Sequence, residues 1–222
     1  MGFKIIESLD SLSKREKILL LGLMLMMGCL SIVYVGLPLW FNTPKFVCID
    51  EKDGVYKKCS YEKACSDESK MKLDPDYDTI DINVYFQLYC SRLSIKSEVQ
   101  SILIVGSWIG CCFNVFIGVG KSKRRQFFTI IAGLYIFACV GSLITTSAHM
   151  CALFMSLTYF AYNSCYANII AVLSENFPEE KKKYFFIFIW ETYTIVGLIA
   201  ANVAYHTNSN WKAINITYGI IM

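Results

Sequence analysis

Residues 86–125 decide the fold of this chain and read FQLYC-SRLSIKSEVQ-SILIVGSWIGCCFNVFIGVG-KSKRR. The stretch begins in a polar segment that contains Cys90, continues as an uncharged apolar run over 99–120, and stops at the basic cluster 121–125. A run of about twenty apolar residues is long enough for a helix to cross a bilayer. Basic residues gather on the cytosolic side of such helices. The stretch therefore predicts a transmembrane helix that starts outside the cytosol and ends inside it.

The composition of the whole chain favours a membrane protein. Of 222 residues, 55% are hydrophobic and 18% are charged, whereas a soluble domain carries roughly a quarter charged residues. The apolar residues also gather in uncharged blocks of about twenty, which soluble core helices rarely show. The net charge is +3, and the basic clusters flank the apolar blocks, so they orient helices and indicate no nucleic acid. The lipid bilayer is the expected partner.

The chain divides into an all-α series of segments. They are a cytosolic amphipathic segment at 1–17, a first span at 18–41, an extracytosolic cysteine loop at 42–97, and the second to sixth spans within 98–222. In this last part the spans are predicted at 99–120, 127–147, 151–173, 184–205 and, incompletely, 213–222. The last run is too short to cross a bilayer, so the prediction is five full spans and an incomplete sixth. For 1–17, an interfacial helix and a disordered tail both fit.

The distribution of Lys and Arg predicts the orientation of these spans. Four basic residues precede the first span, four lie in 121–125, and three form the run 181–183. These are alternate connections, whereas the opposite short connections carry only Lys212. Because basic residues stay on the cytosolic side, we expect a multi-pass integral membrane protein with a cytosolic N-terminus. The pattern does not distinguish the plasma membrane from an organelle membrane.

The extracytosolic loop carries an even number of cysteines: Cys48, Cys59, Cys65 and Cys90. An even count on the oxidising side of a membrane predicts two disulfides, with three pairings open. A zinc site is the alternative, but the loop contains no His and no closely spaced Cys pair. We therefore expect disulfides and no metal.

The same loop contains an acidic run formed by Asp74, Asp76, Asp78 and Asp81. A calcium-binding loop needs a Gly at its sharp turn and a terminal Glu, and this run has neither. We therefore expect a solvated acidic face.

No catalytic or cofactor site is predicted elsewhere. His149 and His206 both fall on the extracytosolic side and are expected to be isolated. The cysteines of the spans are expected to act as small apolar residues. Gly118-Val-Gly120-Lys121 lacks the flanking strand and helix that a phosphate-binding loop needs. The sequence thus predicts that the protein is not an enzyme.

Two sets of polar residues inside the spans are candidates for function. Glu191 is an ionisable residue at membrane depth, where a carboxylate usually faces a cavity or a partner. A wetted or protonated position near the cytosolic rim is the other interpretation. The second set recurs at intervals of three and four residues, which predicts one helix face: Tyr159, Tyr162, Asn163 and Tyr166. This face fits either contact with an organic cation or hydrogen bonding between helices.

Several short motifs follow one another along the chain. Phe86-Gln-Leu-Tyr-Cys90 leads into a helix that contains Gly106-Ser-Trp-Ile-Gly110. Further on, Glu175-Asn-Phe-Pro178 precedes a basic run, and Asn210-Trp211-Lys212 precedes the last apolar run. In this order the motifs resemble the major facilitator superfamily and, within it, the organic cation/anion transporter family. The resemblance covers nearly the whole chain and implies the N-terminal six-helix half of a facilitator-type bundle.

The resemblance implies transport of a small organic solute, a cation or an anion, by alternating access. The implied substrate-binding residues are Glu191, Tyr159, Tyr162, Asn163 and Tyr166. The residues implied in gating and orientation are Lys121, Lys123, Arg124, Arg125 and Glu175, where Glu175 either pairs with Arg124 or Arg125 or stays solvated. A second six-helix half is the required partner, supplied by further C-terminal sequence or by dimerisation.

Two departures from the family pattern favour a different class of function. The superfamily loop after the second span reads Gly-x-x-x-Asp-x-x-Gly-Arg-Arg/Lys, but 118–125 contains no acid. The Arg that the superfamily often has near the start of the fourth span is absent from 155–160. The alternative hypothesis is therefore a degenerate half-transporter that serves as a structural subunit of a larger membrane complex.

Overall fold

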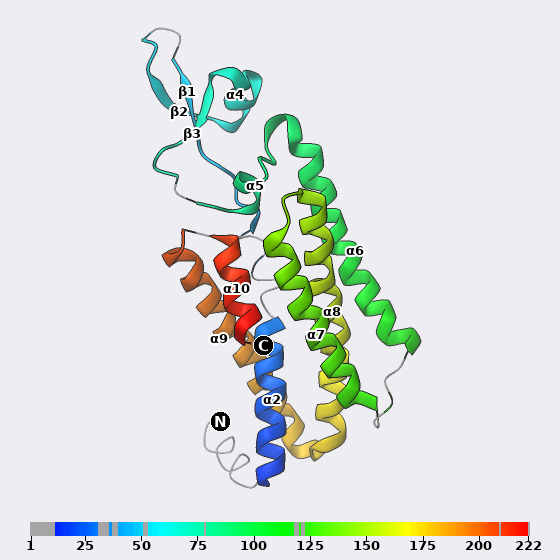
Figure 1. The fold of residues 1–222 in the computed structure, drawn as a ribbon. Coiled ribbons are helices and arrows are strands. Elements are labelled where there is room, and N and C mark those ends of the chain that lie inside the picture. The colour runs from blue at the N-terminus through cyan, green and yellow to red at the C-terminus, as the bar shows by residue number, and fades with distance from the viewer. Residues whose placement is uncertain are drawn as a thin grey trace.

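The computed structural model describes residues 12–30, 36, 40–50, 53–77, 79–117, 120, 123–208 and 210–221. Most of the described residues are helical, and a small disulfide-bonded sheet caps one end of an elongated helical bundle (Figure 1). The bundle helices are α2 (Lys14–Leu30), α6 (Leu93–Ile117), α7 (Arg124–Ile144), α8 (Ala148–Asn176), α9 (Glu179–His206) and α10 (Trp211–Ile221). Helix α8 is central, because it packs against α6, α7, α2 and α9.

All six bundle helices begin earlier than hydropathy predicts, and the difference is largest for α2, α6 and α9. Helix α2 starts at Lys14, so the predicted boundary between 1–17 and 18–41 falls inside one helix. Helix α6 starts at Leu93, within the predicted loop 42–97, and α9 starts at Glu179 rather than at 184. Charged turns are helical here because helix formation depends on backbone hydrogen bonds, whereas the predicted boundaries followed apolar content alone. The segment 1–11 lies outside the described residues.

The start of α2 is fixed by a capping box. The backbone N–H of Glu16 donates to the Ser13 hydroxyl (3.3 Å), and the backbone N–H of Ser13 donates to the Glu16 carboxylate (2.8 Å). These bonds satisfy backbone donors that the first turn of a helix leaves unpaired. The Ser13 hydroxyl is also the largest cause of a lowered pKa of Glu16, with Lys181 at the start of α9 contributing. The first turns of α2 and α9 therefore lie close together.

The closest helix contact joins α6 to α8. A Cβ atom built on Gly106 would lie 2.3 Å from the Ser156 carbonyl oxygen, and one on Gly110 would lie 2.6 Å from that of Phe160. Both distances are shorter than any real contact, so only glycine fits at these positions. Small residues four apart allow two helix backbones to approach in this way.

The cap on the bundle is a three-stranded antiparallel sheet of order β2-β1-β3, so the all-α prediction is wrong for this segment, whose short strands give no extended alternating pattern. Its elements are β1 (Phe46–Ile49), β2 (Tyr56–Cys59), β3 (Met71–Leu73), α4 (Tyr61–Ser66), α5 (Ile82–Tyr85) and the 3-10 turns Glu68–Lys70 and Cys90–Arg92. The two predicted disulfides are confirmed: Cys48 bonds to Cys59 between β1 and β2, and Cys65 bonds to Cys90. The sequence left three pairings open, because only the sheet register brings Cys48 beside β2.

The acidic run is not the solvated face that the sequence predicts. Asp74 is 4% exposed and Asp81 is fully buried, whereas Asp76 is 83% exposed at its side chain. The Asp81 carboxylate caps α5 by accepting from the Val84 N–H (2.8 Å), and Asp74 accepts from the Asp76 N–H (3.1 Å). The prediction was wrong for Asp74 and Asp81 because charge counting does not detect capping; Asp78 lies outside the described residues.

The cap is attached to the turn between α9 and α10. The Ile80 N–H donates to the Asn208 carbonyl, and the Trp211 N–H donates to the Ile80 carbonyl, both at 3.2 Å. The Lys212 ammonium donates to the Tyr85 hydroxyl at 2.9 Å and lies 4.2 Å from the centre of its ring. Main-chain and side-chain contacts thus fix the cap to the bundle.

Two of the described helices, α7 and α9, are long and apolar enough to cross a membrane. Helix α8 is 29 residues long, but its tyrosine and asparagine side chains lower its mean hydropathy. The spans predicted at 18–41 and 99–120 extend into residues outside the described ones. The structure therefore supports a mostly helical protein with two possible spans, a coarser result than the five full spans predicted.

We predict that Gly106→Ala lowers the free energy of unfolding by about 1–3 kcal/mol, because the added methyl forces α6 away from α8. The matched control is Gly133→Ala on the exposed face of α7, where a Cβ meets nothing within 4 Å. This control should leave stability unchanged or raise it by up to about 1 kcal/mol through helix propensity. Thermal melting of both purified proteins measures the effect, and equal melting temperatures would disprove the tight contact.

A second prediction concerns the buried Asp81. Burial raises its pKa above the ordinary value of 3.8, so the folded protein holds this proton more tightly than the unfolded chain. The free energy of unfolding should therefore fall as the pH rises from 3.8 through the raised pKa. Asp81→Asn keeps a side-chain oxygen to cap α5 and removes the titration. The melting temperatures of the wild-type and Asp81→Asn proteins should be similar at low pH, and that of the wild type should fall below that of the variant as the pH rises. Parallel curves would contradict the assignment of this pH dependence to Asp81.

Candidate functional site

The four residues predicted to share one face of α8 all lie on that helix, but their side chains contact two different neighbouring helices. The Asn163 amide donates to the Ser107 hydroxyl of α6 (2.8 Å), whereas the Tyr166 ring lies 6.1 Å from the Trp190 ring of α9. The face is broad enough to contact both helices, and the residue spacing could not show which helix each side chain meets. The structure therefore does not bring Tyr159, Tyr162, Asn163, Tyr166 and Glu191 together as one site.

Asn163 belongs to a polar network between α6 and α8. The Asn114 amide donates to the Asn163 carbonyl (2.8 Å), and its oxygen accepts from the Asn168 amide (2.9 Å). Asn168 also donates to the Ser164 carbonyl (2.9 Å). This pattern matches hydrogen bonding between helices, so it favours the structural interpretation of Asn163 over solute contact.

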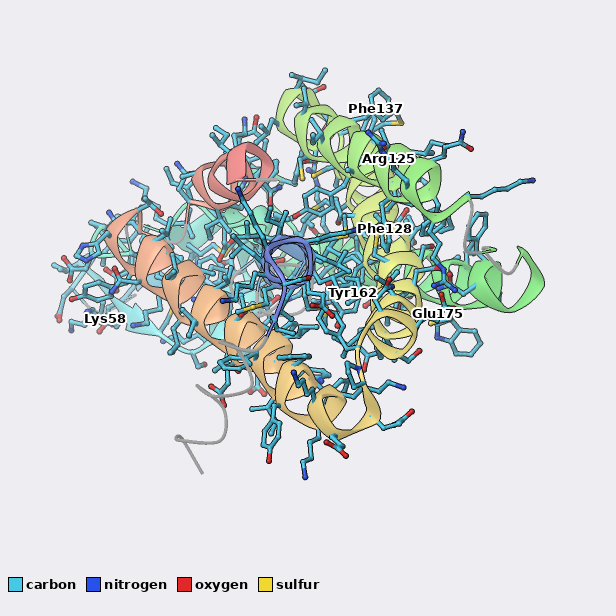
Figure 2. All side chains as sticks on the ribbon, turned by 90° about the horizontal axis from the view of Figure 1, so that it is seen from below. Lys58, Arg125, Phe128, Phe137, Tyr162 and Glu175 are labelled. Atoms are coloured by element: carbon cyan, nitrogen blue, oxygen red, sulfur yellow. A yellow bond between two sulfur atoms is a disulfide. The ribbon has the colours of Figure 1, made fainter. Side chains whose placement is uncertain are left out.

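Two tyrosines of α8 belong to an aromatic strip that runs from α8 to α9. Tyr159 and Tyr162 are 4% and 6% exposed, and Tyr162 lies inside the bundle (Figure 2). The Tyr162 and Tyr166 rings stack with centres 6.2 Å apart, and the Tyr166 ring meets the edge of Trp190. The Trp190 ring also lies 5.4 Å from that of Tyr193. We call Tyr162, Tyr166, Trp190 and Tyr193 the aromatic strip.

Glu191 follows Trp190 on α9 and is exposed. It lies twelve residues after the first residue of α9 and fifteen before the last. At 1.5 Å per residue, it is therefore about 18 Å from the start of the helix. Among the described residues of α6, α7, α8 and α9, it is the one charged side chain more than two turns from a helix end. This position is in the middle of the helix rather than near its rim.

The basic end of the bundle contains the ion pair expected of Glu175. The Arg124 guanidinium donates to both carboxylate oxygens of Glu175 at 2.7 Å. This two-bonded geometry is the strongest form of such a pair, and the Arg124 side chain is only 14% exposed. The predicted pairing with Arg124 is confirmed, and it joins the start of α7 to the end of α8.

Of the other residues implied in gating, the two that the structure describes show no comparable contact to a neighbouring helix. Lys123 and Arg125 are exposed, and Lys121 lies outside the described residues. In the view along the bundle, Arg125 and Glu175 lie at the ends of α7 and α8 (Figure 2).

His149 is not isolated, which corrects the sequence prediction. Its Nε2 lies 3.0 Å from the Glu98 carboxylate, so the first turn of α8 is joined to the start of α6. Fifty-one positions separate the two residues, and no local pattern signals such a pair. His206 is exposed at the end of α9.

The remaining titratable groups form no reactive cluster in the described part of the chain. Cys139, Cys151 and Cys165 are buried and free, as expected of small apolar residues, whereas Cys111 and Cys112 are exposed. No three His, Cys, Asp or Glu side chains gather closely enough among the described residues to hold a metal ion. The arrangement offers helix contacts, ion pairs at the helix ends and one carboxylate in the middle of α9.

Comparison with known protein families and with curated proteins finds no match to this chain. The likeness to facilitator-type transporters therefore stays a prediction that depends on the motifs.

We predict that the Arg124–Glu175 pair stabilises the bundle by about 1 kcal/mol, discounted because the Glu175 side chain is 35% exposed. A double-mutant cycle with Arg124→Gln and Glu175→Gln should give this coupling energy from melting data. The matched control is Lys182 with Glu179, a pair within one helix in which Glu179 is 86% exposed. A coupling energy no larger than that of the control would contradict the prediction.

Proposed function

We propose that this chain is the membrane-embedded N-terminal half of a facilitator-type transporter for small organic solutes. The proposal includes five full spans, an incomplete sixth span and a cytosolic N-terminus. The supporting observations are the packing order of the helices, the distribution of charge between the two ends of the bundle, and the position of Glu191.

The packing order supports two inverted repeats. Helices α2, α6 and α7 form a first set of three, and α8, α9 and α10 form a second set that runs in the opposite sense (Figure 1). Helix α6 packs on α8 as α9 packs on α2, and α7 packs on α8 as α10 packs on α2. Exchanging the two sets preserves these four contacts, whereas α9 also packs on α8 and α10 with no matching contact of the same extent between α6 and α2 or α7 among the described residues. Inverted repeats of this kind are common in transporters.

The two ends of the bundle differ in a way that supports the proposed orientation. The starts of α2, α7 and α9, with their basic residues, lie at one end, and the disulfide-bonded cap lies at the other (Figure 1). Basic ends face the cytosol, and disulfides form in oxidising spaces. Both signals give the same orientation.

Glu191 is the single observation that carries a transport function. A carboxylate in the middle of a membrane helix is retained where it faces a cavity or a partner. Because the neighbouring Trp190 is 37% exposed, a cationic organic solute bound here would meet a negative charge and an aromatic ring. Transport would proceed by rocking this bundle against a second one around the site. The second bundle is further C-terminal sequence or a partner chain.

The second candidate function is a structural subunit of a larger membrane complex. It is favoured by the network of Asn114, Asn163 and Asn168, whose amides bond between α6 and α8. In this case Glu191 meets a neighbouring subunit rather than a solute.

We predict that Glu191→Gln reduces uptake of a small organic cation about tenfold, which corresponds to loss of roughly 1.4 kcal/mol of binding. Uptake is measured in vesicles from cells that express the whole gene product. Glu180→Gln, an exposed residue at the start of the same helix, is the control and should leave uptake unchanged. Wild-type uptake in the Glu191 variant would remove this residue from the mechanism, and no uptake by any variant would favour the structural subunit.

A further inference from the structure

The outward face of α9 differs from the outward faces of the other long helices. Its exposed residues recur along the helix from the basic end to the cap: Ile187, Glu191, Thr194, Leu198, Asn202 and Tyr205. Leu198 is 66% exposed and Tyr205 is 80% exposed. A carboxylate, a hydroxyl and an amide therefore lie on one face together with large apolar side chains. We call this set the α9 face.

The corresponding faces of α6 and α7 suit lipid. The large exposed side chains in the middle of α6 are Ile104, Val105, Trp108 and Ile109, and those of α7 are Ile130, Ile136, Phe137, Val140 and Ile144. None of them is charged. Apolar faces of this kind lie against acyl chains at no cost. In the view along the bundle, α9 lies at the edge opposite α6 and α7 (Figure 2).

A lipid-facing Glu191 would be unfavourable. An ionised side chain at the centre of a membrane helix is costly because it loses its hydration. Such residues face protein or water and pair with other groups. Since Glu191 is exposed on the outside of the bundle among the described residues, a pairing group for it would come from beyond the described bundle.

A second copy of the chain is a poor occupant. All copies insert in the same orientation, so a two-fold axis along the membrane normal would place α9 against α9 with both Glu191 side chains at one depth. Two carboxylates that meet in this way repel each other. A head-to-tail contact is no better, because the described residues in the middle of α2, α6, α7 and α8 include no Lys or Arg.

We propose that the α9 face is covered by a transmembrane helix of a different bundle, and that this helix carries a Lys or Arg at the depth of Glu191. The basic side chain supplies a charge-assisted hydrogen bond to the carboxylate. Thr194 and Asn202 offer further hydrogen bonds between the helices, and Leu198 packs between them. The occupant is thus defined by charge complementarity, whether it belongs to this polypeptide or to another.

This inference rests on the membrane embedding proposed above and holds for both candidate functions. In a structural subunit the ion pair is permanent. In a transporter a cationic solute exchanges with the basic side chain at the same carboxylate. The ion pair can therefore be tested without any assay of transport.

The experiment places a photo-reactive benzophenone amino acid at position 198 in the whole gene product and irradiates native membranes. The control position is Ile130, on the outward face of α7, where we expect adducts with lipid only. At position 198 we expect a protein adduct whose peptide, sequenced by mass spectrometry, has a Lys or Arg about two helical turns from the attachment point, because seven residues separate Leu198 from Glu191. An adduct with lipid only, with a second copy of this chain, or with a peptide lacking a basic residue would overturn the proposal.

Charge variants separate this ion pair from simple packing. Glu191→Lys should reduce the adduct at position 198 about tenfold, and exchanging the identified basic residue for Glu in the same protein should restore it. Glu191→Asp, which keeps the charge, should retain the adduct. Failure of the exchange to restore it would overturn the ion pair. Absence of uptake with an intact adduct contradicts the proposed transport and leaves the ion pair standing. Intact uptake with no adduct contradicts the ion pair and leaves the proposed transport standing.

Discussion

The close approach of α6 and α8 at Gly106 and Gly110 is the contact on which the rest of the bundle depends. With no side chain at these positions, the two backbones come near enough for Asn114 to bond to both Asn163 and Asn168. Buried amides need hydrogen-bond partners inside the protein, so the network depends on the close approach that the glycines allow. Helix α8 is thereby fixed in the centre, and α7, α2 and α9 pack around it.

Polar side-chain contacts then join α8 to its neighbours at both ends. His149 meets Glu98 of α6 at the end near the cap, and Glu175 meets Arg124 of α7 at the basic end. Near the first of these contacts the cap is also bonded to the turn between α9 and α10 through Ile80. Polar contacts therefore lie at the two ends of the bundle, with apolar packing between them.

Helix α9 contributes to both proposals because its two sides differ chemically. The Trp190 ring contacts Tyr166 of α8 and is 37% exposed, whereas Glu191 is exposed and faces away from this contact. A rotation of about 100° per residue separates neighbouring side chains on a helix, so adjacent positions face different surroundings. The aromatic strip therefore leads to the edge of the bundle, and the carboxylate marks the surface where a solute or a second bundle would meet it.

The sequence by itself determined the helices and their order, the disulfide count, the ends that carry basic charge, and the choice of Glu191 and Glu175 as unusual acids. These features are visible because they depend on local composition and spacing. Only the tertiary structure decided that Cys48 bonds to Cys59, that Asp81 is a buried cap, and that Asn163 faces α6 while Tyr166 faces α9. It also paired His149 with Glu98 across 51 positions. Such contacts follow from strand register and helix rotation, which depend on residues far apart in the chain and leave no periodic signal in it.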